Sequence, residues 1–225
     1  MRAILPWTQR PLLLAFQDQL LRFQHLDAED VHRVISFTSK EPITLRLLNL
    51  LNDGDVFLDV GASNGIYSLP AALRVGSNGL VIAVEADSKK SLRLTQNAQN
   101  NSLSNRIVVE NCFVASNPDS SARTTTLDEI FRIRDYPAPT FLKLDVDGPE
   151  LEVLKGFQDG LKAFTCLKIL QIEFQETNTE LVSLLSELGF RLVAFEFPKA
   201  RDADVVSGRS MTGNGWFIRT LKPSS

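Results

Sequence analysis

The stretch Asp55–Gly65, with the sequence DVFLDVGASNG, decides the fold class of this 225-residue chain. Its first half contains a short apolar run, Val56–Val60, which is typical of a parallel strand buried on both faces. A glycine-containing turn follows at once, and we expect an apolar helix from about Ile66 to Val75. A strand that enters a helix through such a turn is the first unit of an alternating α/β fold.

The same alternation continues toward the C-terminus. Further strands are expected at 80–84, 107–109, 141–144 and 167–174, with a final pair at 191–197 and 216–220. Helices are expected at 88–100, 126–131, 149–157 and 179–188. Strands that alternate with helices predict a doubly wound parallel sheet, in which ligands bind outside the carboxyl ends of the strands.

The N-terminal residues read differently. Apolar side chains between Leu12 and Phe23 recur at helical spacing, Asp27 is placed to cap a second helix, and a third helix starts near Glu41–Pro42. We therefore expect a helical N-terminal extension or cap at 1–40, and one main domain at 41–225. The polar segments 111–139 and 198–215 are expected to be loops, and the second has the length of a lid that covers a site.

Composition excludes several function classes. The net charge is −3 with a pI of about 5.5, so the basic excess of a nucleic-acid-binding protein is missing. No apolar run approaches the ~20 residues of a membrane span, and no signal peptide is evident. Cys112 and Cys166 form neither a disulfide framework nor a zinc motif. We expect two buried, reduced thiols and a cytoplasmic protein.

The glycine turn is the first candidate binding element. Gly61 and Gly65 are spaced GxxxG, which is neither the GxGxxG of dinucleotide folds nor the GxxxxGK of phosphate loops. This spacing favours a nucleoside-like ligand without a pyrophosphate. Asp59, just before the glycines, would repel phosphate but suits the cationic amino-acid end of a ligand. The alternative is an ordinary turn.

Glu85 follows the second expected strand, about twenty residues after the glycine turn. An acidic residue at this place in a doubly wound fold commonly accepts hydrogen bonds from ribose hydroxyls. The alternative is a carboxylate that favours the positive end of the following helix.

Four acidic residues are predicted at one edge of the sheet. Asp145, Asp147 and Glu150 follow the strand at 141–144, and Glu173 ends the next strand. Carboxylates this close repel one another, so raised pKa values, a metal or a bound cation are open alternatives, as is an ion pair with Lys143.

Together these motifs resemble the FkbM family of methyltransferases. The resemblance spans roughly residues 41–220. It is carried by Glu41–Pro42, Gly54–Ala62, Gly65, Tyr67–Ser68, Glu85, Thr126–Asp128, Phe141–Gly148 and Glu150–Gly156. It implies a Rossmann-like, seven-stranded sheet of the class I methyltransferase type with an antiparallel last strand. It also implies an S-adenosylmethionine-dependent enzyme that methylates hydroxyls of natural products or sugars.

The resemblance also implies roles by position. Asp59, Gly61 and Ala62 would line the methionine part of the donor, Glu85 would hold the ribose, and Asp145 would lie beside the methyl group and the acceptor. The remaining donor contacts are expected at Ser63, Asn64, Gly65 and Ala86. The segment 111–114 takes the place of the usual adenine contact.

Two positions depart from the family pattern. Ser63 replaces the asparagine of the usual DVGAN loop, although its hydroxyl can still form hydrogen bonds. Pro149 stands where histidine or alanine is often found, so a histidine base is absent at that place.

We therefore expect transfer of a methyl group to a small-molecule or sugar hydroxyl. The candidate bases are Asp145 first, then Asp147, Glu150 and Glu173. No metal is expected, because no histidine accompanies these acids; a metal bridging Asp145 and Glu173 is the runner-up. A non-catalytic S-adenosylmethionine-binding module is the main alternative, and an NAD-linked enzyme is disfavoured by the missing GxGxxG. A homodimer is compatible with the sequence, which does not identify the acceptor.

Overall fold

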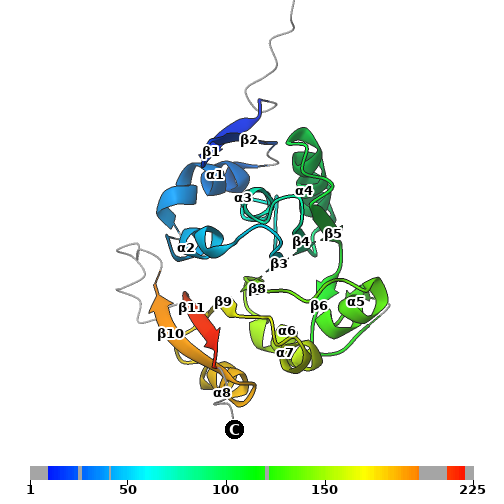
Figure 1. Ribbon diagram of the computed structural model, residues 1–225, viewed down its shortest axis with the longest axis vertical. Coiled ribbons are helices and arrows are strands. Elements are labelled where there is room, and N and C mark those ends of the chain that lie inside the picture. Colours follow the sequence, from blue (N-terminus) through cyan, green and yellow to red (C-terminus); the bar gives the residue numbers. More distant parts are fainter. Residues whose placement is uncertain (1–9, 25–26, 41, 120–121, 198–211, 221–225) are drawn as a thin grey trace, which may run out of the picture. The chain divides into compact units, whose positions relative to one another are not determined.

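The computed structural model describes residues 10–24, 27–40, 42–119, 122–197 and 212–220 (Figure 1). The chain divides into two units, the first drawn from residues 1–55 and 61–111, the second from 56–60 and 112–225. The elements of the first unit are β1 (Leu12–Phe16), β2 (Gln19–Phe23), α1 (Ala28–Lys40), α2 (Pro42–Leu50), α3 (Ser68–Arg74), β4 (Leu80–Val84), α4 (Ser88–Asn100) and β5 (Ile107–Glu110). Those of the second unit are β3 (Val56–Val60), β6 (Phe113–Val114), β7 (Thr124–Thr125), α5 (Leu127–Arg134), β8 (Phe141–Leu144), α6 (Glu150–Lys155), α7 (Gln158–Ala163), β9 (Ile169–Gln175), α8 (Thr179–Glu187), β10 (Phe190–Glu196) and β11 (Thr212–Arg219).

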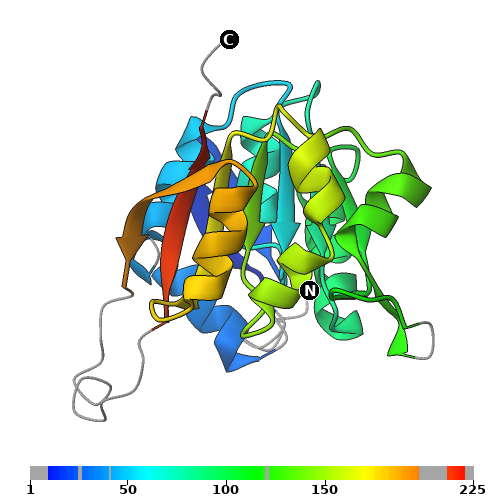
Figure 2. The ribbon, with the colours of Figure 1, turned by 90° about the horizontal axis from the view of Figure 1, so that it is seen from below.

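A seven-stranded sheet carries its strands in the order β10-β11-β9-β8-β3-β4-β5. In the second unit β3, β8 and β9 pair in parallel, whereas β11 runs antiparallel to both β9 and β10. In Figure 2, α6, α7 and α8 lie over one face of the strands of this unit. In the first unit β4 and β5 pair in parallel. The predicted α/β fold with an antiparallel last strand is confirmed.

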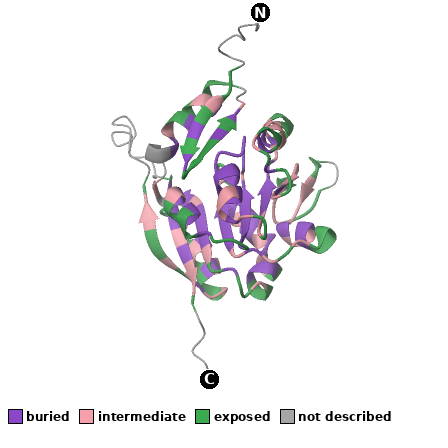
Figure 3. Cartoon of the chain, turned by 45° about the horizontal axis from the view of Figure 1, so that its top comes forward, coloured by how far each residue is buried: buried purple, intermediate pink, exposed green. Residues whose placement is uncertain are grey.

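The apolar runs explain why the parallel strands form where they do. Every residue of β3 and of β8 is buried, as is β4 apart from its first residue. A strand covered on both faces needs a continuous apolar run, and this pattern predicts its bounds well. Figure 3 shows the burial concentrated on these strands, while exposed residues lie on the outer faces of the helices.

The expected helix between Leu12 and Phe23 is wrong. These residues form an antiparallel hairpin, β1 and β2, turning at Gln17, whose φ is +53°. Leu14 and Phe16 are buried while Leu13 is exposed, which is the period-two pattern of a strand. The side-chain amide of Asn101, at the end of α4, bonds both the N–H and the C=O of Arg22 at 2.8 Å. Asn101 thereby satisfies backbone groups at the edge of β2. The helix was predicted because the spacing of the apolar residues in this segment also fits a helix.

The other N-terminal helices are confirmed. The Asp27 carboxylate accepts a hydrogen bond from the N–H of Asp30 at 3.0 Å, so it caps α1 as expected. Helix α2 begins at Pro42, where proline's missing N–H is tolerated.

Two further expectations need correction. Cys112 is half-buried and Cys166 is exposed, so neither thiol is a core residue, and neither takes part in a disulfide. Residues 212–215 belong to β11 and not to the predicted loop 198–215, of which 198–211 lie outside the described residues. Antiparallel pairing with β9 begins at Thr212, opposite Gln175.

Gly156 closes α6 in a place that no larger residue fits. A Cβ atom there would lie 2.0 Å from the backbone oxygen of Ala115. The Gly156 carbonyl also accepts a hydrogen bond from the N–H of Asp128 at 3.1 Å. This glycine therefore serves the packing of the second unit.

Candidate active site

The first candidate region is the turn of residues 61–65, called here the glycine loop. Gly61 and Gly65 have φ of +83° and +89°, and Ser63 has φ of +52°. Left-handed backbone is open to glycine and costs energy for other residues, asparagine and aspartate least. The asparagine that the family commonly carries at this position would therefore suit the turn better than Ser63 does. The N–H groups of Gly61 and Ala62 both bond the carbonyl of Val84, 2.9 and 3.1 Å away, which fixes the loop at the end of β4.

The Glu85 carboxylate binds the backbone of the glycine loop. One carboxylate oxygen accepts the N–H of Ser63 at 2.7 Å, and the other accepts the N–H of Asp87 at 2.8 Å. The side-chain amide of Asn111 bonds the carbonyls of Glu85 and Ala86 at 2.8 and 3.1 Å. Each carboxylate oxygen has a second lone pair, so Glu85 can hold the backbone and still accept a bond from a ligand.

Two buried polar side chains of the glycine loop stand out. Asn64 is fully buried and Ser63 is 4% exposed. Within the described part of the chain, no hydrogen-bond partner exists for the Oδ1 and Nδ2 atoms of Asn64 or for the Oγ of Ser63. A buried polar group without a partner costs about 1–3 kcal/mol, and such groups call for an explanation, a ligand being one. These atoms fit the role of donor contacts predicted from sequence.

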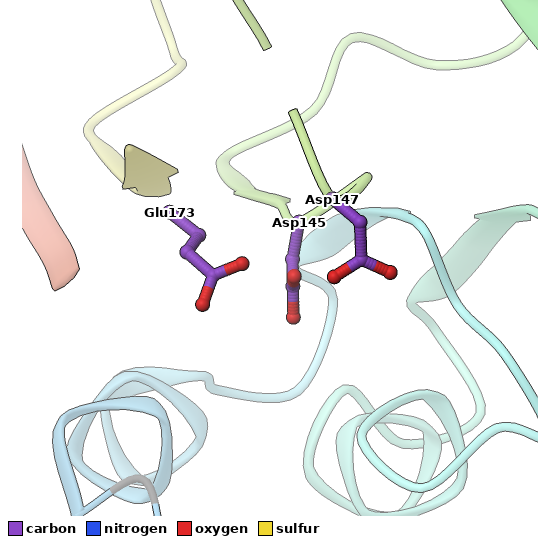
Figure 4. A group of neighbouring side chains, drawn as sticks. All are labelled: Asp145, Asp147 and Glu173. Atoms are coloured by element: carbon purple, nitrogen blue, oxygen red, sulfur yellow. The ribbon is translucent and has the colours of Figure 1, made fainter. Parts of the chain in front are cut away.

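The second candidate region is the acid cluster, Asp145, Asp147 and Glu173, which lies wholly in the second unit. One carboxylate oxygen from each residue lies within 4.8 Å of the others. Figure 4 shows Asp145 between the other two, with all three carboxylates pointing to the same side. Glu173 lies inside β9 and is paired with Asn214 of β11, not at the end of its strand as predicted.

A buried lysine stands behind the acid cluster. The Nζ of Lys143 lies 2.8 Å from the Oδ2 of Asp145, and the two side chains are 1% and 16% exposed. Lys143 is paired in register with the buried Asp59 of β3 on one side and with the buried Gln171 of β9 on the other. The side-chain amide of Gln171 donates a hydrogen bond to Oδ1 of Asn214 at 3.0 Å. The ion pair that the sequence left as an alternative is therefore present. It favours the charged form of Asp145.

Glu150, predicted as a candidate base, has a structural role in this arrangement. Its side chain is buried, and its Oε1 accepts the N–H groups of Val146 and Gly148 at 3.2 and 3.0 Å. It thereby holds a turn in which Asp147 and Gly148 have φ of +59° and +134°. Glu150 positions Asp147 through the backbone.

A cleft of about 480 Å³ opens beside the acid cluster. Its polar lining residues are Asp147, Glu150, Glu173, Gln175, Asn178 and Thr212. Sequence reasoning missed the last three. Asn178 had a signal, since it precedes a predicted helix, and its Oδ1 does cap α8 through the N–H of Leu181 at 3.1 Å.

A larger cavity of about 590 Å³ lies between α5 and α7 and contains none of the predicted site residues. Asp128 lies there and accepts the N–H groups of Gly160 and Asp159 at 2.7 and 3.0 Å. Burial raises the pKa of Asp128 above its ordinary value, against the effect of these hydrogen bonds. Carboxylates line this cavity too, but among the described residues the group of three acids with oxygens within 4.8 Å of one another is Asp145, Asp147 and Glu173, so we place the candidate active site at the acid cluster.

Comparison with known proteins shows what this chain is similar to. Residues 118–192 match the family model described as Methyltransferase FkbM domain. All four predicted catalytic acids lie within the matched residues, and the resemblance to FkbM methyltransferases expected from sequence is confirmed over this part of the chain. The hexuronic acid methyltransferase AglP of Haloferax volcanii is 26% identical over 220 residues, covering 88% of this chain and 89% of that protein.

Solved structures share the fold of this chain. Fibrillarin of Aeropyrum pernix, solved with natively bound S-adenosyl-L-methionine, has a TM-score of 0.58 at 13% identity, covering 92% of this chain and 82% of that one. An S-adenosylmethionine-dependent O-methyltransferase of Thermotoga maritima has a TM-score of 0.52 at 18% identity, covering 82% and 67%. The Rossmann-like class I methyltransferase fold is thereby confirmed. Among the described residues, no helix combines the length and apolar character needed to cross a membrane.

Proposed function

We propose that this chain transfers a methyl group from S-adenosylmethionine to a hydroxyl of a small molecule, with a sugar as the simplest acceptor class. The observation that carries the proposal is that the FkbM match contains the whole acid cluster. The name of the relative AglP, a hexuronic acid methyltransferase, supports a sugar acceptor.

The glycine loop and Glu85 are assigned to the donor. When bound, S-adenosylmethionine supplies a methyl group activated on a sulfonium sulfur. Gly61 and Ala62 would line its methionine part, with Asp59 supplying negative charge near the amino group. Glu85 and Ala86 would meet the ribose. The unpartnered polar atoms of Ser63 and Asn64 would gain their hydrogen bonds from the donor, and Gly65 keeps the following helix close.

The acid cluster is assigned to the acceptor. Asp145 would receive the proton of the attacking hydroxyl, while Asp147 and Glu173 would orient the acceptor through its other hydroxyls. Holding the acceptor oxygen in line with the methyl carbon supplies most of the acceleration in such a displacement. A positioned base contributes about 10²–10⁴-fold more. Lys143, at 2.8 Å from Asp145, would keep that carboxylate oriented.

A divalent cation held by the same acids is the alternative way to activate the hydroxyl. Oxygen ligands alone suit Mg²⁺, Mn²⁺ or Ca²⁺ rather than zinc. Full methyl transfer after treatment with a chelator would exclude this alternative, and loss of activity restored by added Mg²⁺ would support it.

Calorimetric titration with S-adenosylhomocysteine tests the donor assignment. We expect micromolar binding that weakens strongly in Glu85→Ala. The matched control is Asp87→Ala, which removes a carboxylate from the same turn; Asp87 accepts the N–H groups of Lys89 and Lys90 and none from the glycine loop. Absence of binding by folded wild-type protein would refute the donor. Binding without turnover on any hydroxylated acceptor would favour the non-catalytic module.

A further inference from the structure

One buried side chain links the glycine loop to the N-terminal hairpin of β1 and β2. Asn97 of α4 is completely buried, and its Nδ2 donates hydrogen bonds to the carbonyl of Asn64 at 2.9 Å and to that of Gln24 at 3.4 Å. Its Oδ1 accepts the N–H of Gln24 at 2.8 Å. Gln24 directly follows β2, so a single amide joins the hairpin to the glycine loop, within the first unit.

The next turn of α4 carries a second asparagine that makes only part of these contacts. Asn101 bonds both the N–H and the C=O of Arg22 at 2.8 Å, and its Nδ2 also donates to the carbonyl of Asn97. Arg22 and Gln24 are alternate residues, so their backbone groups face the same side of the strand. The two amides therefore pair one edge of the hairpin, and Asn97 in addition bonds the glycine loop.

The carbonyl that Asn97 binds lies in the part of the glycine loop with the unpartnered amide. The N–H of Gly65 donates to the carbonyl of Ala62 at 2.9 Å, so both groups of the peptide between Asn64 and Gly65 are held. The packing beside it is tight, because a Cβ atom at Gly65 would lie 3.0 Å from the Cγ of Leu94. Backbone conformation limits the rotamers of a side chain, so a fixed peptide also fixes where the Asn64 amide points.

We propose that Asn97 is a positioning residue of the donor site, and that the N-terminal hairpin favours donor binding through it. The inference rests on the proposed function, because it takes the glycine loop as the element that binds the donor. The N–H of Gln24 requires an acceptor, which directs Oδ1 of Asn97 to the hairpin and Nδ2 to Asn64. An amide turned by 180° would place Oδ1 against the Asn64 carbonyl, and two acceptors form no hydrogen bond.

Calorimetric titration with S-adenosylhomocysteine compares wild type with Asn97→Ala and Asn101→Ala. Each variant removes an amide that pairs the hairpin, so both should lower the melting temperature of the apo protein. Affinity should fall about fivefold to tenfold in Asn97→Ala, the value of one hydrogen bond, and less than about twofold in Asn101→Ala. Equal affinities in the two variants, whether both are lowered or both are unchanged, would overturn the inference.

Amide hydrogen exchange in wild type tests the coupling without a substitution, so it decides the question even if Asn97→Ala does not fold. Coupling between two sites is reciprocal, so a hairpin that favours donor binding is itself stabilised by the donor. Saturating S-adenosylhomocysteine should slow exchange of the Gln24 N–H by about fivefold to tenfold, the same factor as the affinity ratio. Asn101→Ala keeps the bond between Gln24 and Asn97 and should retain this slowing.

The outcomes separate the inference from the proposed function. Unchanged exchange at Gln24 on saturation would refute the inference alone, as would wild-type affinity in Asn97→Ala. Failure of folded wild-type protein to bind S-adenosylhomocysteine would refute the proposed function and the inference with it.

Discussion

The glycine loop and the turn after β8 use the same device for different ends. In each, a buried carboxylate accepts two backbone N–H groups. Glu85 bonds Ser63 in the glycine loop and Asp87 outside it, whereas Glu150 bonds Val146 and Gly148 in the turn after β8. The turns differ in the polar groups beside them. The glycine loop buries Asn64, whose side-chain atoms have no partner in the described chain. The turn after β8 adjoins a buried lysine that is paired with Asp145.

This difference separates residues that maintain the fold from those available to a ligand. A carboxylate that satisfies backbone N–H groups is needed by the apo protein, whatever it later binds. A buried amide without a hydrogen-bond partner lowers the stability of the apo protein, and that free energy is recovered only when a bound ligand supplies the hydrogen bond. Partners therefore distinguish the two roles better than residue type or place in a motif.

The largest expected effect lies at Asp145. Asp145→Asn should lower kcat by about 10²–10⁴-fold, because the amide cannot take the hydroxyl proton. Steady-state release of S-adenosylhomocysteine measures it. Asp159→Asn, the same change on an exposed residue of α7, is the control. A fall of less than about tenfold would remove Asp145 as the base.

The buried ion pair should dominate stability in the second unit. Lys143→Met removes the cation beside Asp145 and should lower the free energy of unfolding by about 3 kcal/mol, because a buried charge is left unmatched. Urea denaturation measures the loss. Lys162→Met on the exposed face of α7 should change stability by less than about 0.5 kcal/mol. Similar small values for both variants would contradict the structural importance of the pair.

The unpartnered amide should behave in the opposite way. Asn64→Ala removes two buried groups that lack partners, so the apo protein should lose at most about 1 kcal/mol and can gain stability. Its affinity for S-adenosylhomocysteine should fall about tenfold, the value of one hydrogen bond to a polar ligand. Thermal unfolding with and without S-adenosylhomocysteine gives both numbers. A large loss of apo stability with unchanged affinity would mean that Asn64 serves the fold.

The smallest effects compare one helix cap from each unit. Asp87 caps α4 and Thr126 caps α5, so changing either to alanine should cost about 1 kcal/mol at pH 7. The N–H groups of Lys90 and Lys89 lower the pKa of Asp87 below its ordinary value of 3.8. The contribution of Asp87 is therefore complete above that ordinary value and is lost as the pH falls through the lower folded value. The cost of Asp87→Ala should shrink in that window, whereas the cost of Thr126→Ala should stay constant, because threonine does not titrate.

Sequence predicted the buried strands and the motif-bearing turns well. The bounds of β3, β4, β8 and α4 match those expected, because a fully buried strand or a capped amphipathic helix leaves a clear pattern in its own residues. The hairpin at 12–23 was missed because a short apolar set fits both helical and strand spacing, and the amide of Asn101 that pairs its edge is far away in sequence.

Sequence predicted which acidic residues lie close together better than it predicted what each of them contacts. The sequence placed Asp145, Asp147 and Glu173 at one edge of the sheet, and the structure brings them within 4.8 Å. It could not tell that Glu150, at the start of α6, turns toward the backbone, nor that Lys143 in β8 is buried, because both depend on which way a side chain points. The lining residue Thr212 comes from the antiparallel strand β11, which sequence placed too late.

The packing of Gly156 affects how the sequence of a relative can be used to decide whether that relative is an active enzyme. Gly156, at the end of the family block, packs against the backbone of Ala115 and accepts the N–H of Asp128, and both of these residues lie outside the acid cluster. A descendant that lost methyl transfer would still need that glycine, and Glu150 with it, in order to fold. Divergence confined to Asp145, with the glycine retained, would therefore mark a pseudoenzyme among the relatives, whereas retention of the glycine alone says nothing about activity.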